Sequence, residues 1–171
     1  MLATLGEGRL AGSWTLDAAR SQVRLATKSM WGMVPVKGVF GEVSGSGAVT
    51  EAGEVTGTLT VAAGSIDTKI RKRDDHLRSA HFFDAANYPD ITFSVEAISP
   101  AADGVIVAGG LTVRGTTRPV SFGAAVSGDD SAVTLDAEVP VDRADYGLTF
   151  NQLGMMAMKS VITIHAVFTR Q

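Results

Sequence analysis

"SAVTLDAEVPVD", residues 131–142, alternates apolar and polar side chains along its length. Successive side chains of an extended chain point to opposite faces, so one face of this segment carries Val133, Leu135, Ala137, Val139 and Val141. The opposite face carries Thr134, Asp136 and Glu138. Alternation with a period of two residues predicts a β-strand that buries one face against a core.

The same alternation recurs along the rest of the chain and predicts an all-β protein. Strands are expected over residues 13–17, 22–30, 34–40, 42–50, 54–63, 91–99, 105–114, 118–126, 131–142 and 160–170. Links such as "EAGE" at 51–54 and "SGDDS" at 127–131 are short and turn-rich, which favours antiparallel neighbours. An antiparallel sheet with one apolar face must close or fold over to hide it, which predicts a barrel of about eight strands.

One segment breaks the period of two. Between residues 70 and 86 the spacing becomes helical, with matching positions at Ile70, Asp74, Leu77 and Ala80. Asp67 or Thr68 could cap a first helical turn, Asp74 or Asp75 could cap a second, and Pro89 ends the segment. The predicted fold class is therefore an all-β antiparallel barrel with one helical insertion.

Composition and charge restrict the classes of function. The chain has 15 Lys and Arg residues against 18 Asp and Glu residues, a formal net charge of -3. Such a balance gives no general attraction to a phosphate backbone, and the one basic cluster, "KIRKR" at 69–73, is followed at once by two aspartates. No nucleic-acid partner is therefore expected. The chain contains no cysteine, which excludes disulfides, thiolate catalysis and zinc–sulfur sites.

The length of 171 residues predicts one domain, over residues 13–171, preceded by a flexible tail at 1–12. The N-terminal residues lack the basic start and the apolar run of a secretory signal. No stretch reaches the roughly 20 apolar residues that a membrane span requires. A soluble cytoplasmic protein without a membrane span is expected.

Five segments of the chain resemble a known family. They are "WTLDAARSQVRLATKSM", "VKGVFGEVSG", "SIDTKIRKRDDHLRSAHFFDAANYPDITF", "GGLTVRGTTRPV" and "DRADYGLTF". Together they resemble the YceI-like family of polyisoprenoid-binding proteins, over nearly the whole chain from Trp14 to Phe168. The resemblance implies a lipocalin-like barrel that holds a polyisoprenoid or another long amphiphile, and it supplies no catalytic residues. Ser29 and His81 depart from the family's pattern, so no head-group preference is transferred.

An apolar pocket is expected where the inner faces of the strands meet the paired phenylalanines and the methionine-rich segment "NQLGMMAMKS" at 151–160. Methionine adapts to irregular apolar shapes and suits a pliable wall. The predicted pocket residues are Phe40, Leu59, Phe82, Phe83, Phe93, Leu111, Phe122, Leu135, Met155, Met156 and Met158. In a small barrel such side chains can simply fill the interior. These residues do not decide between a filled core and a ligand tunnel, and the family resemblance favours the tunnel.

The charged stretch at 73–87 is predicted to cover one side or end of the barrel. The polar candidates, including one from a later turn, are Arg73, Asp74, His76, Arg78 and Arg114. In one interpretation they cap the helix and tether it across the barrel opening. In the other, an arginine contacts an anionic head group of the ligand.

Neither a metal site nor a catalytic site is expected in this stretch. His76 and His81 are five residues apart, which on a regular helix turns their side chains away from each other. A base at His76 would also need a nucleophile, and no recognised motif surrounds Ser65 or Ser79. The sequence therefore predicts no metal, no cofactor and no enzymatic activity.

The predicted function is that of a carrier or sequestering protein for an isoprenoid, a quinone or a fatty-acid-like lipid. Burying one methylene contributes about 0.8 kcal/mol, so apolar walls can provide affinity while polar contacts set orientation. Two alternatives are an enzyme that acts on such a lipid through His76 and a nearby acid, and an interaction module whose barrel holds no ligand. A homodimer formed through a strand face is compatible with all three.

Overall fold

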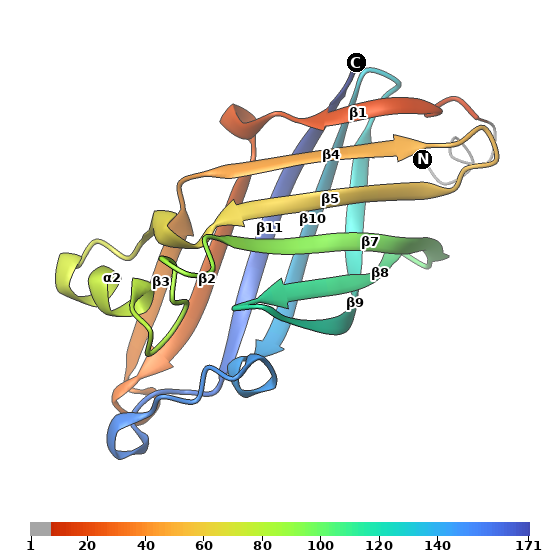
Figure 1. The fold of residues 1–171 in the computed structure, drawn as a ribbon. Helices are drawn as coiled ribbons and strands as arrows, with labels where there is room; N and C mark the ends of the chain where they lie inside the picture. Colours follow the sequence, from red (N-terminus) through yellow and green to blue (C-terminus); the bar gives the residue numbers. More distant parts are fainter. Residues whose placement is uncertain (1–7) are drawn as a thin grey trace.

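The computed structural model describes residues 8–171, except for the side chain of Gln152. The described residues form one sheet of eleven strands and one α-helix, α2 (Arg71–Arg78), as Figure 1 shows. The strands are β1 (Gly12–Leu16), β2 (Gln22–Ser29), β3 (Val34–Phe40), β4 (Val43–Val49), β5 (Val55–Ala62), β6 (Ile66–Asp67), β7 (Asp90–Ala101), β8 (Gly104–Val113), β9 (Thr116–Gly128), β10 (Ala132–Asp142) and β11 (Lys159–Arg170). No helix among these residues is long and apolar enough to cross a bilayer.

Eight of the strands close into a barrel, which confirms the predicted fold class. Their order is β1-β4-β5-β7-β8-β9-β10-β11, and the last strand returns to the first through pairs such as Trp14 with Arg170. All the strand pairs are antiparallel. The first half of β11, Val161 to His165, pairs instead with β2, which continues the sheet into β3 and β6.

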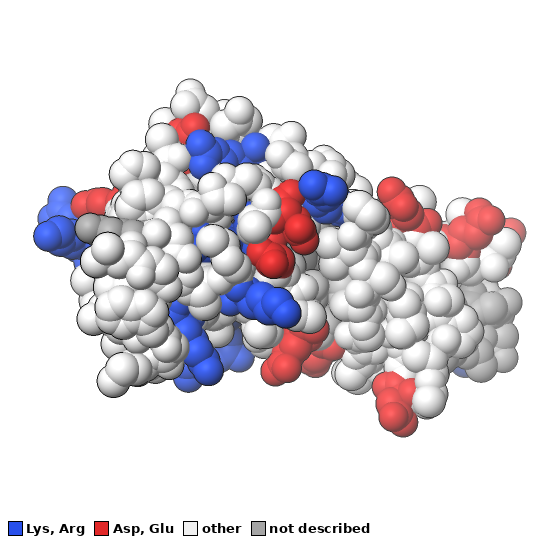
Figure 2. All heavy atoms as spheres, turned by 90° about the horizontal axis from the view of Figure 1, so that it is seen from below, with Lys and Arg blue, Asp and Glu red and all other residues white. Residues whose placement is uncertain are grey.

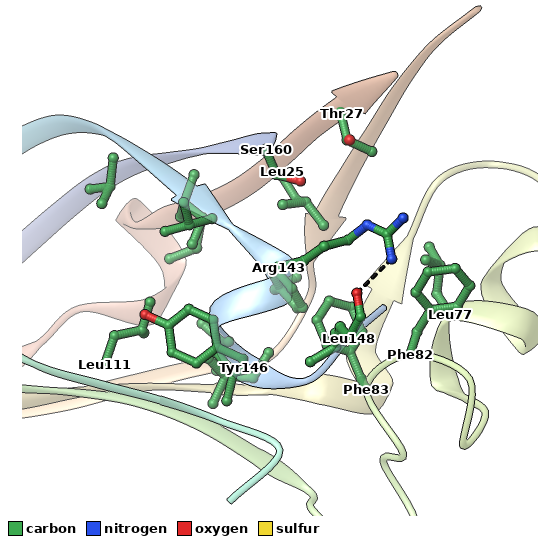
Figure 3. A pocket seen from close by; sticks show the side chains of 18 of the residues that line it. Leu25, Thr27, Leu77, Phe82, Phe83, Leu111, Arg143, Tyr146, Leu148 and Ser160 are labelled. Atoms are coloured by element: carbon green, nitrogen blue, oxygen red, sulfur yellow. Dashed lines mark hydrogen bonds between the residues drawn. The ribbon is translucent and has the colours of Figure 1, made fainter. Parts of the chain in front are cut away.

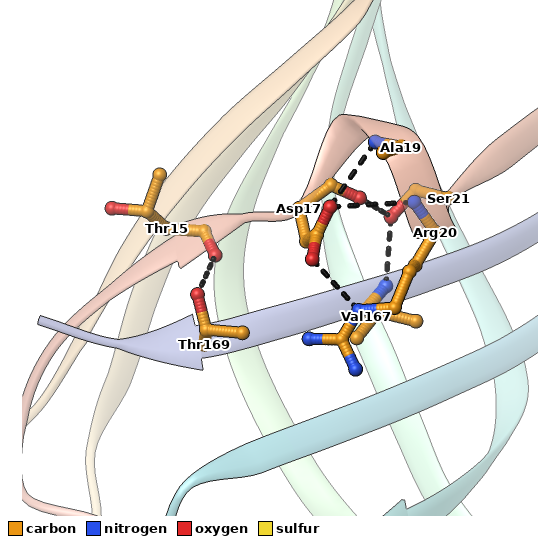
Figure 4. A network of polar contacts seen from close by, with 7 residues as sticks. All are labelled: Thr15, Asp17, Ala19, Arg20, Ser21, Val167 and Thr169. Atoms are coloured by element: carbon orange, nitrogen blue, oxygen red, sulfur yellow. Dashed lines mark hydrogen bonds and ion pairs between the residues drawn. The ribbon is translucent and has the colours of Figure 1, made fainter.

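The corner between β1 and β2 is fixed by side-chain hydrogen bonds (Figure 4). The Asp17 carboxylate accepts hydrogen bonds from the backbone N–H of Ala19 and from Nε of Arg20, at 3.1 and 2.7 Å. The hydrogen bond from Arg20 is the main reason that the pKa of Asp17 is lowered. The Ser21 hydroxyl donates to the Asp17 carbonyl at 2.7 Å and accepts from the backbone N–H of Val167 at 2.9 Å. Ser21 thereby fastens the corner to β11.

Replacing Ser21 with alanine is expected to lower the free energy of unfolding by about 1–2 kcal/mol, because it leaves the buried Val167 N–H without its partner. Denaturant titration followed by circular dichroism measures the change. A matched control is Ser127→Ala, since Ser127 lies exposed on β9 and an exposed substitution shifts stability by less than about 0.5 kcal/mol. Equal stability of the two variants would contradict this role for Ser21.

Alternation along the strands sorts the side chains as the sequence predicts. On β8, Val105, Val107, Leu111 and Val113 are buried inside the barrel. Buried residues form two clusters: one surrounds Val105 and Val107, and the other combines strand residues with Phe82 from the segment after α2. The second cluster is therefore completed by the helical insertion.

The sequence predicted a flexible tail over residues 1–12, but the part of it that the structure describes, residues 8–12, packs against the barrel. Leu10 is 4% exposed, and its carbonyl accepts a hydrogen bond from Nε1 of Trp14 at 2.8 Å. Arg170 also donates to the carbonyls of Arg9 and Ala11. Residues 8–12 thus pack on the barrel, and residues 1–7 lie outside the described part of the chain.

The helical insertion is shorter than the expected 70–86 and begins without the predicted caps. The residue before α2 is Ile70, which makes no side-chain capping bond, and the helix ends at Arg78. Asp67 accepts instead from the backbone N–H of Lys69, at 2.9 Å. From Ser79 onward the chain follows turns, including a left-handed Asp84 with φ 49°, until β7 begins.

Candidate functional site

A cavity opens inside one half of the barrel, beneath α2 and the segment that follows it. It encloses about 190 Å³ of space for the centres of water-sized molecules, more than ten times the ~10–15 Å³ that one water needs. Its walls are mostly apolar and come from β2, β3, β5, β7, β8, β9, β10 and β11. Figure 3 shows how Phe82, Phe83 and Leu77 face Leu25 and Leu111 across it.

Most of the apolar residues predicted for a pocket lie in its wall. Eight of them line the cavity: Phe40, Leu59, Phe82, Phe83, Phe93, Leu111, Phe122 and Met156. The barrel interior contains both packed side chains and open space, because the cluster around Val105 and Val107 lies in one half and the cavity in the other. Contact between these walls and a ligand stays a prediction.

Three predicted pocket residues do not line the cavity. Leu135 packs against the filled cluster, further along the barrel. Met155 and Met158 lie outside the lining, and their backbone carbonyls accept hydrogen bonds from the backbone N–H groups of Trp31 and Arg143 at 3.0 and 2.9 Å. A methionine-rich composition indicates a pliable segment but does not say which of its side chains turns inward.

Arg143 is the main polar group of the cavity, and sequence reasoning did not single it out. It is half-buried, and its guanidinium donates to four backbone carbonyls at 2.6–3.2 Å, those of Leu148, Phe150, Met156 and Ala157. The bond to Leu148 is drawn in Figure 3. Arg143 therefore holds residues 148–157 in place as one wall of the cavity. Burial lowers the pKa of its guanidinium.

Tyr146 follows Arg143 in the same short helical turn and also lines the cavity. The residue is 5% exposed, and its hydroxyl makes no hydrogen bond to the part of the chain that the structure describes. Burial raises the pKa of this hydroxyl. The only sequence signal for either residue was the segment "DRADYGLTF", which contributed to the family resemblance without an assigned role.

The start of α2 is tethered by Arg73 and Asp74. The buried Asp74 carboxylate accepts from the backbone N–H and the hydroxyl of Thr68, at 2.8 and 2.5 Å. Arg73 donates from Nε to the Thr68 hydroxyl and from a terminal nitrogen to the Thr68 carbonyl, at 2.8 and 2.9 Å. Asp74 thus reaches back to the segment before the helix and does not cap a helical turn.

Arg78 and Arg114 extend the tether to both sides of the helical insertion. Arg78 donates to the carbonyls of Gly64 and Ile66, at 2.8 and 3.1 Å, and pairs with Asp75. Arg114 donates to the carbonyl of Phe82, at 3.2 Å. Within the set of polar candidates, Arg73 and His76 line the cavity, while Asp74, Arg78 and Arg114 do not. The hydrogen bonds of the three arginines fasten the helical insertion to the barrel. Contact between one of them and a ligand head group stays a prediction.

The two histidines of this region lie against each other, so the spacing argument for His76 and His81 was wrong. His76 Nε2 and His81 Nδ1 are 3.1 Å apart, and the His81 ring stacks on Phe150 with its centroid at 4.2 Å. The predicted separation holds only for a continuous helix. Helix α2 ends at Arg78, and the turn after it brings His81 back to His76. Within the described chain, no group of three or more His, Asp or Glu side chains is placed to hold a metal ion.

Comparisons with known proteins agree with this architecture. The family model described as "YceI-like domain" matches residues 14–169. A UPF0312 protein of Staphylococcus aureus (strain MSSA476) is 31% identical over 162 residues, which cover 87% of this chain and 92% of that protein. The crystal structure of Burkholderia cenocepacia BcnA is 26% identical and superposes with a TM-score of 0.80, over 89% of this chain and 98% of that one.

A more distant likeness shows the same fold. It is to the structure of a polyisoprenoid binding domain from Saccharophagus degradans implicated in plant cell wall breakdown, with 18% identity and a TM-score of 0.73. That comparison covers 92% of this chain and 98% of the other. The fold is therefore kept at low sequence identity.

Proposed function

Since this chain belongs to the YceI-like family, we propose that it binds one long-chain apolar amphiphile, of the isoprenoid, quinone or fatty-acid type, inside the barrel. The observation that carries the proposal is the empty space next to a filled core, because a barrel of this size can be packed solid. The described polyisoprenoid binding by the Saccharophagus degradans domain supports the same class of ligand. The protein then acts as a carrier or a sequestering protein.

The walls of the cavity suit an apolar chain. Burying ten to fifteen methylenes contributes roughly 8–12 kcal/mol, before the entropy of fixing a flexible chain is subtracted. Among the wall's polar side chains that make no hydrogen bond to the described chain, that of Tyr146 belongs to the most deeply buried residue, at 5% exposure. Affinity therefore comes from the apolar surface, and the ligand's polar end is oriented by a small number of contacts.

Binding without catalysis is proposed because the two arginines of the cavity already serve the fold and His76 has no acid partner. Arg143 and Arg73 spend their hydrogen bonds on backbone carbonyls and on Thr68. His76 faces His81 and aromatic rings, and no hydrogen bond joins it to a carboxylate in the described chain. An enzyme acting through His76 would need such an acid or a positioned nucleophile.

The experiment is to purify the full chain without detergent and compare its native mass spectrum with that of a solvent extract. We expect an added mass in the native spectrum that equals the mass of one extracted amphiphile. Protein that arrives without ligand should take up added prenol or fatty acid and gain thermal stability, because the ligand binds the folded state. Protein that neither carries nor takes up any such molecule would contradict the proposal.

A further inference from the structure

Two loops at the open end of the cavity expose large apolar side chains. They are the turn between β2 and β3 and the turn before β11, which lie side by side in Figure 1. The N–H of Trp31 donates to the carbonyl of Met155, at 3.0 Å, and the N–H of Ala157 donates to the carbonyl of Lys28, at 3.0 Å. We call the exposed set the apolar tip: Met30, Trp31, Met33, Val34 and Leu153.

The exposure of the apolar tip is unusual for its residue types. Trp31 is 64% exposed, Met33 is 82% exposed and Leu153 is 78% exposed. Met30, Trp31 and Leu153 also adopt left-handed backbone conformations, with φ of 50°, 57° and 55°. Bulky residues rarely adopt that conformation, and strained backbone that packing does not require tends to mark a functional surface.

Exposed lysines flank the apolar tip, and Asp142 lies opposite one of them, Lys159, in the β10–β11 pairing without forming an ion pair with it. The segments 18–41 and 146–171, which contain both loops, include no Asp or Glu. Their cations next to the loops are Lys28, Lys37 and Lys159, all exposed and without an ion pair in the described chain. In Figure 2, which views the molecule from below, Asp and Glu predominate among the charged residues at the right-hand end, and acidic side chains also lie between the basic ones in the middle. The lysines next to the two loops are thus available to an anionic surface, although the formal net charge is -3.

We infer that the apolar tip docks the protein onto a phospholipid surface that carries negative headgroups. Tryptophan and methionine at the end of a protein enter the interface of a bilayer, and lysines around them pair with anionic headgroups. The cavity opens beside the tip, since Lys28, Ser29, Met156 and Ala157 belong to its wall. A docked tip would thus bring the cavity mouth to the lipid phase, where an apolar ligand could pass without crossing water.

The inference extends the proposed function but is tested without any cavity ligand. The full chain is mixed with vesicles of phosphatidylcholine alone or of phosphatidylcholine with phosphatidylglycerol, and binding is measured by flotation. We expect binding to the mixed vesicles that weakens as salt is added, because the lysines act through a screened potential. Tryptophan fluorescence should shift to the blue on binding, and the shift reports Trp31 because Trp14 is already buried, at 5% exposure.

Substitutions separate the two parts of the tip. The triple variant Trp31→Ser, Met33→Ser, Leu153→Ser should bind the mixed vesicles about tenfold more weakly or worse, and so should Lys28→Gln with Lys159→Gln. All these side chains are exposed, so thermal melting should be nearly unchanged. The matched control is Ile106→Ser, which removes an exposed apolar side chain from the barrel wall and should bind as the unchanged chain does.

The outcomes distinguish docking from ligand binding. A chain that retains its amphiphile but does not float with mixed vesicles overturns the docking inference and leaves the proposed function standing. A chain that floats but never holds an amphiphile overturns the proposed function alone. Sedimentation velocity of the same variants tests whether a second copy of the chain binds the apolar tip instead. A dimer that dissociates in the triple variant, with no vesicle binding by the unchanged chain, would show that a second copy covers this surface.

Discussion

Replacing Arg143 with methionine is expected to lower the free energy of unfolding by about 3–5 kcal/mol. Each backbone carbonyl that loses its donor in a fully buried site costs roughly 1–3 kcal/mol, and Arg143 serves four carbonyls. Arg143 and three of these four residues are only half-buried, so water can replace part of the lost bonding and the expected total stays near the lower bound. Methionine keeps an apolar stem of similar shape, so the loss of unfolding free energy measures the contribution of the hydrogen bonds. Because the four carbonyls belong to residues 148–157, that wall should also loosen, and ligand retention should fall together with stability.

Denaturant unfolding measures the stability loss, and hydrogen exchange of residues 148–157 measures the loosening. A matched control is Arg24→Met, because Arg24 is an exposed arginine for which no hydrogen bond or ion pair to the described residues is found. It should change stability by less than about 0.5 kcal/mol. Arg143→Lys should recover part of the loss, since an ammonium donates from one point and cannot span four carbonyls. An Arg143→Met variant as stable as the control would contradict the role of Arg143 in holding residues 148–157 in place.

Replacing Leu111 with tryptophan is expected to abolish ligand retention while the protein still folds. Leu111 lines the cavity and lies beside Tyr146 in Figure 3, so a larger ring there would occupy the space of the ligand. Overpacking a solid core costs about 1–3 kcal/mol, but the empty cavity gives the new ring room. We expect at least about a tenfold loss of bound amphiphile, because blocked space removes most of the apolar contact.

The measurement is the native mass spectrum after purification, together with the uptake of added prenol or fatty acid. Leu135→Trp is the matched control, since the same change falls on β10 outside the cavity, beside the filled cluster. It should keep its ligand even if it loses some stability. Retention of a full complement of amphiphile by Leu111→Trp would place the ligand elsewhere and would contradict binding inside this cavity.

The alternation of "SAVTLDAEVPVD" illustrates what a local pattern can establish. Val139 and Val141 line the cavity and Ala137 is buried beside it, all on the face that the period of two predicted. The backbone geometry of a single strand decides which side chains point into the barrel, so neighbours along the chain are enough to predict it. Leu135 shares that face but lies further along the barrel, and a position along the axis depends on which strands pair and in what register.

The helical insertion shows where local reasoning fails. The helical spacing of the sequence extends to Ala80, but the helix ends at Arg78 and the chain then turns to place Phe82 in the core. Arg78 and Arg114 hold this turn by binding carbonyls that are distant in sequence. The contact between His76 and His81 follows from that turn. Tertiary contacts therefore overrode the spacing argument.

The amino-acid sequence by itself determined the strands, their inward faces, the antiparallel barrel and the family, because each depends on side-chain order within short segments. Only the tertiary structure decided that half of the barrel is hollow, that Arg143 holds a wall through four carbonyls, and that two apolar loops meet at the cavity mouth. Those features depend on distances between segments that are far apart in the chain. Closure of the barrel sets these distances, and no local period encodes them.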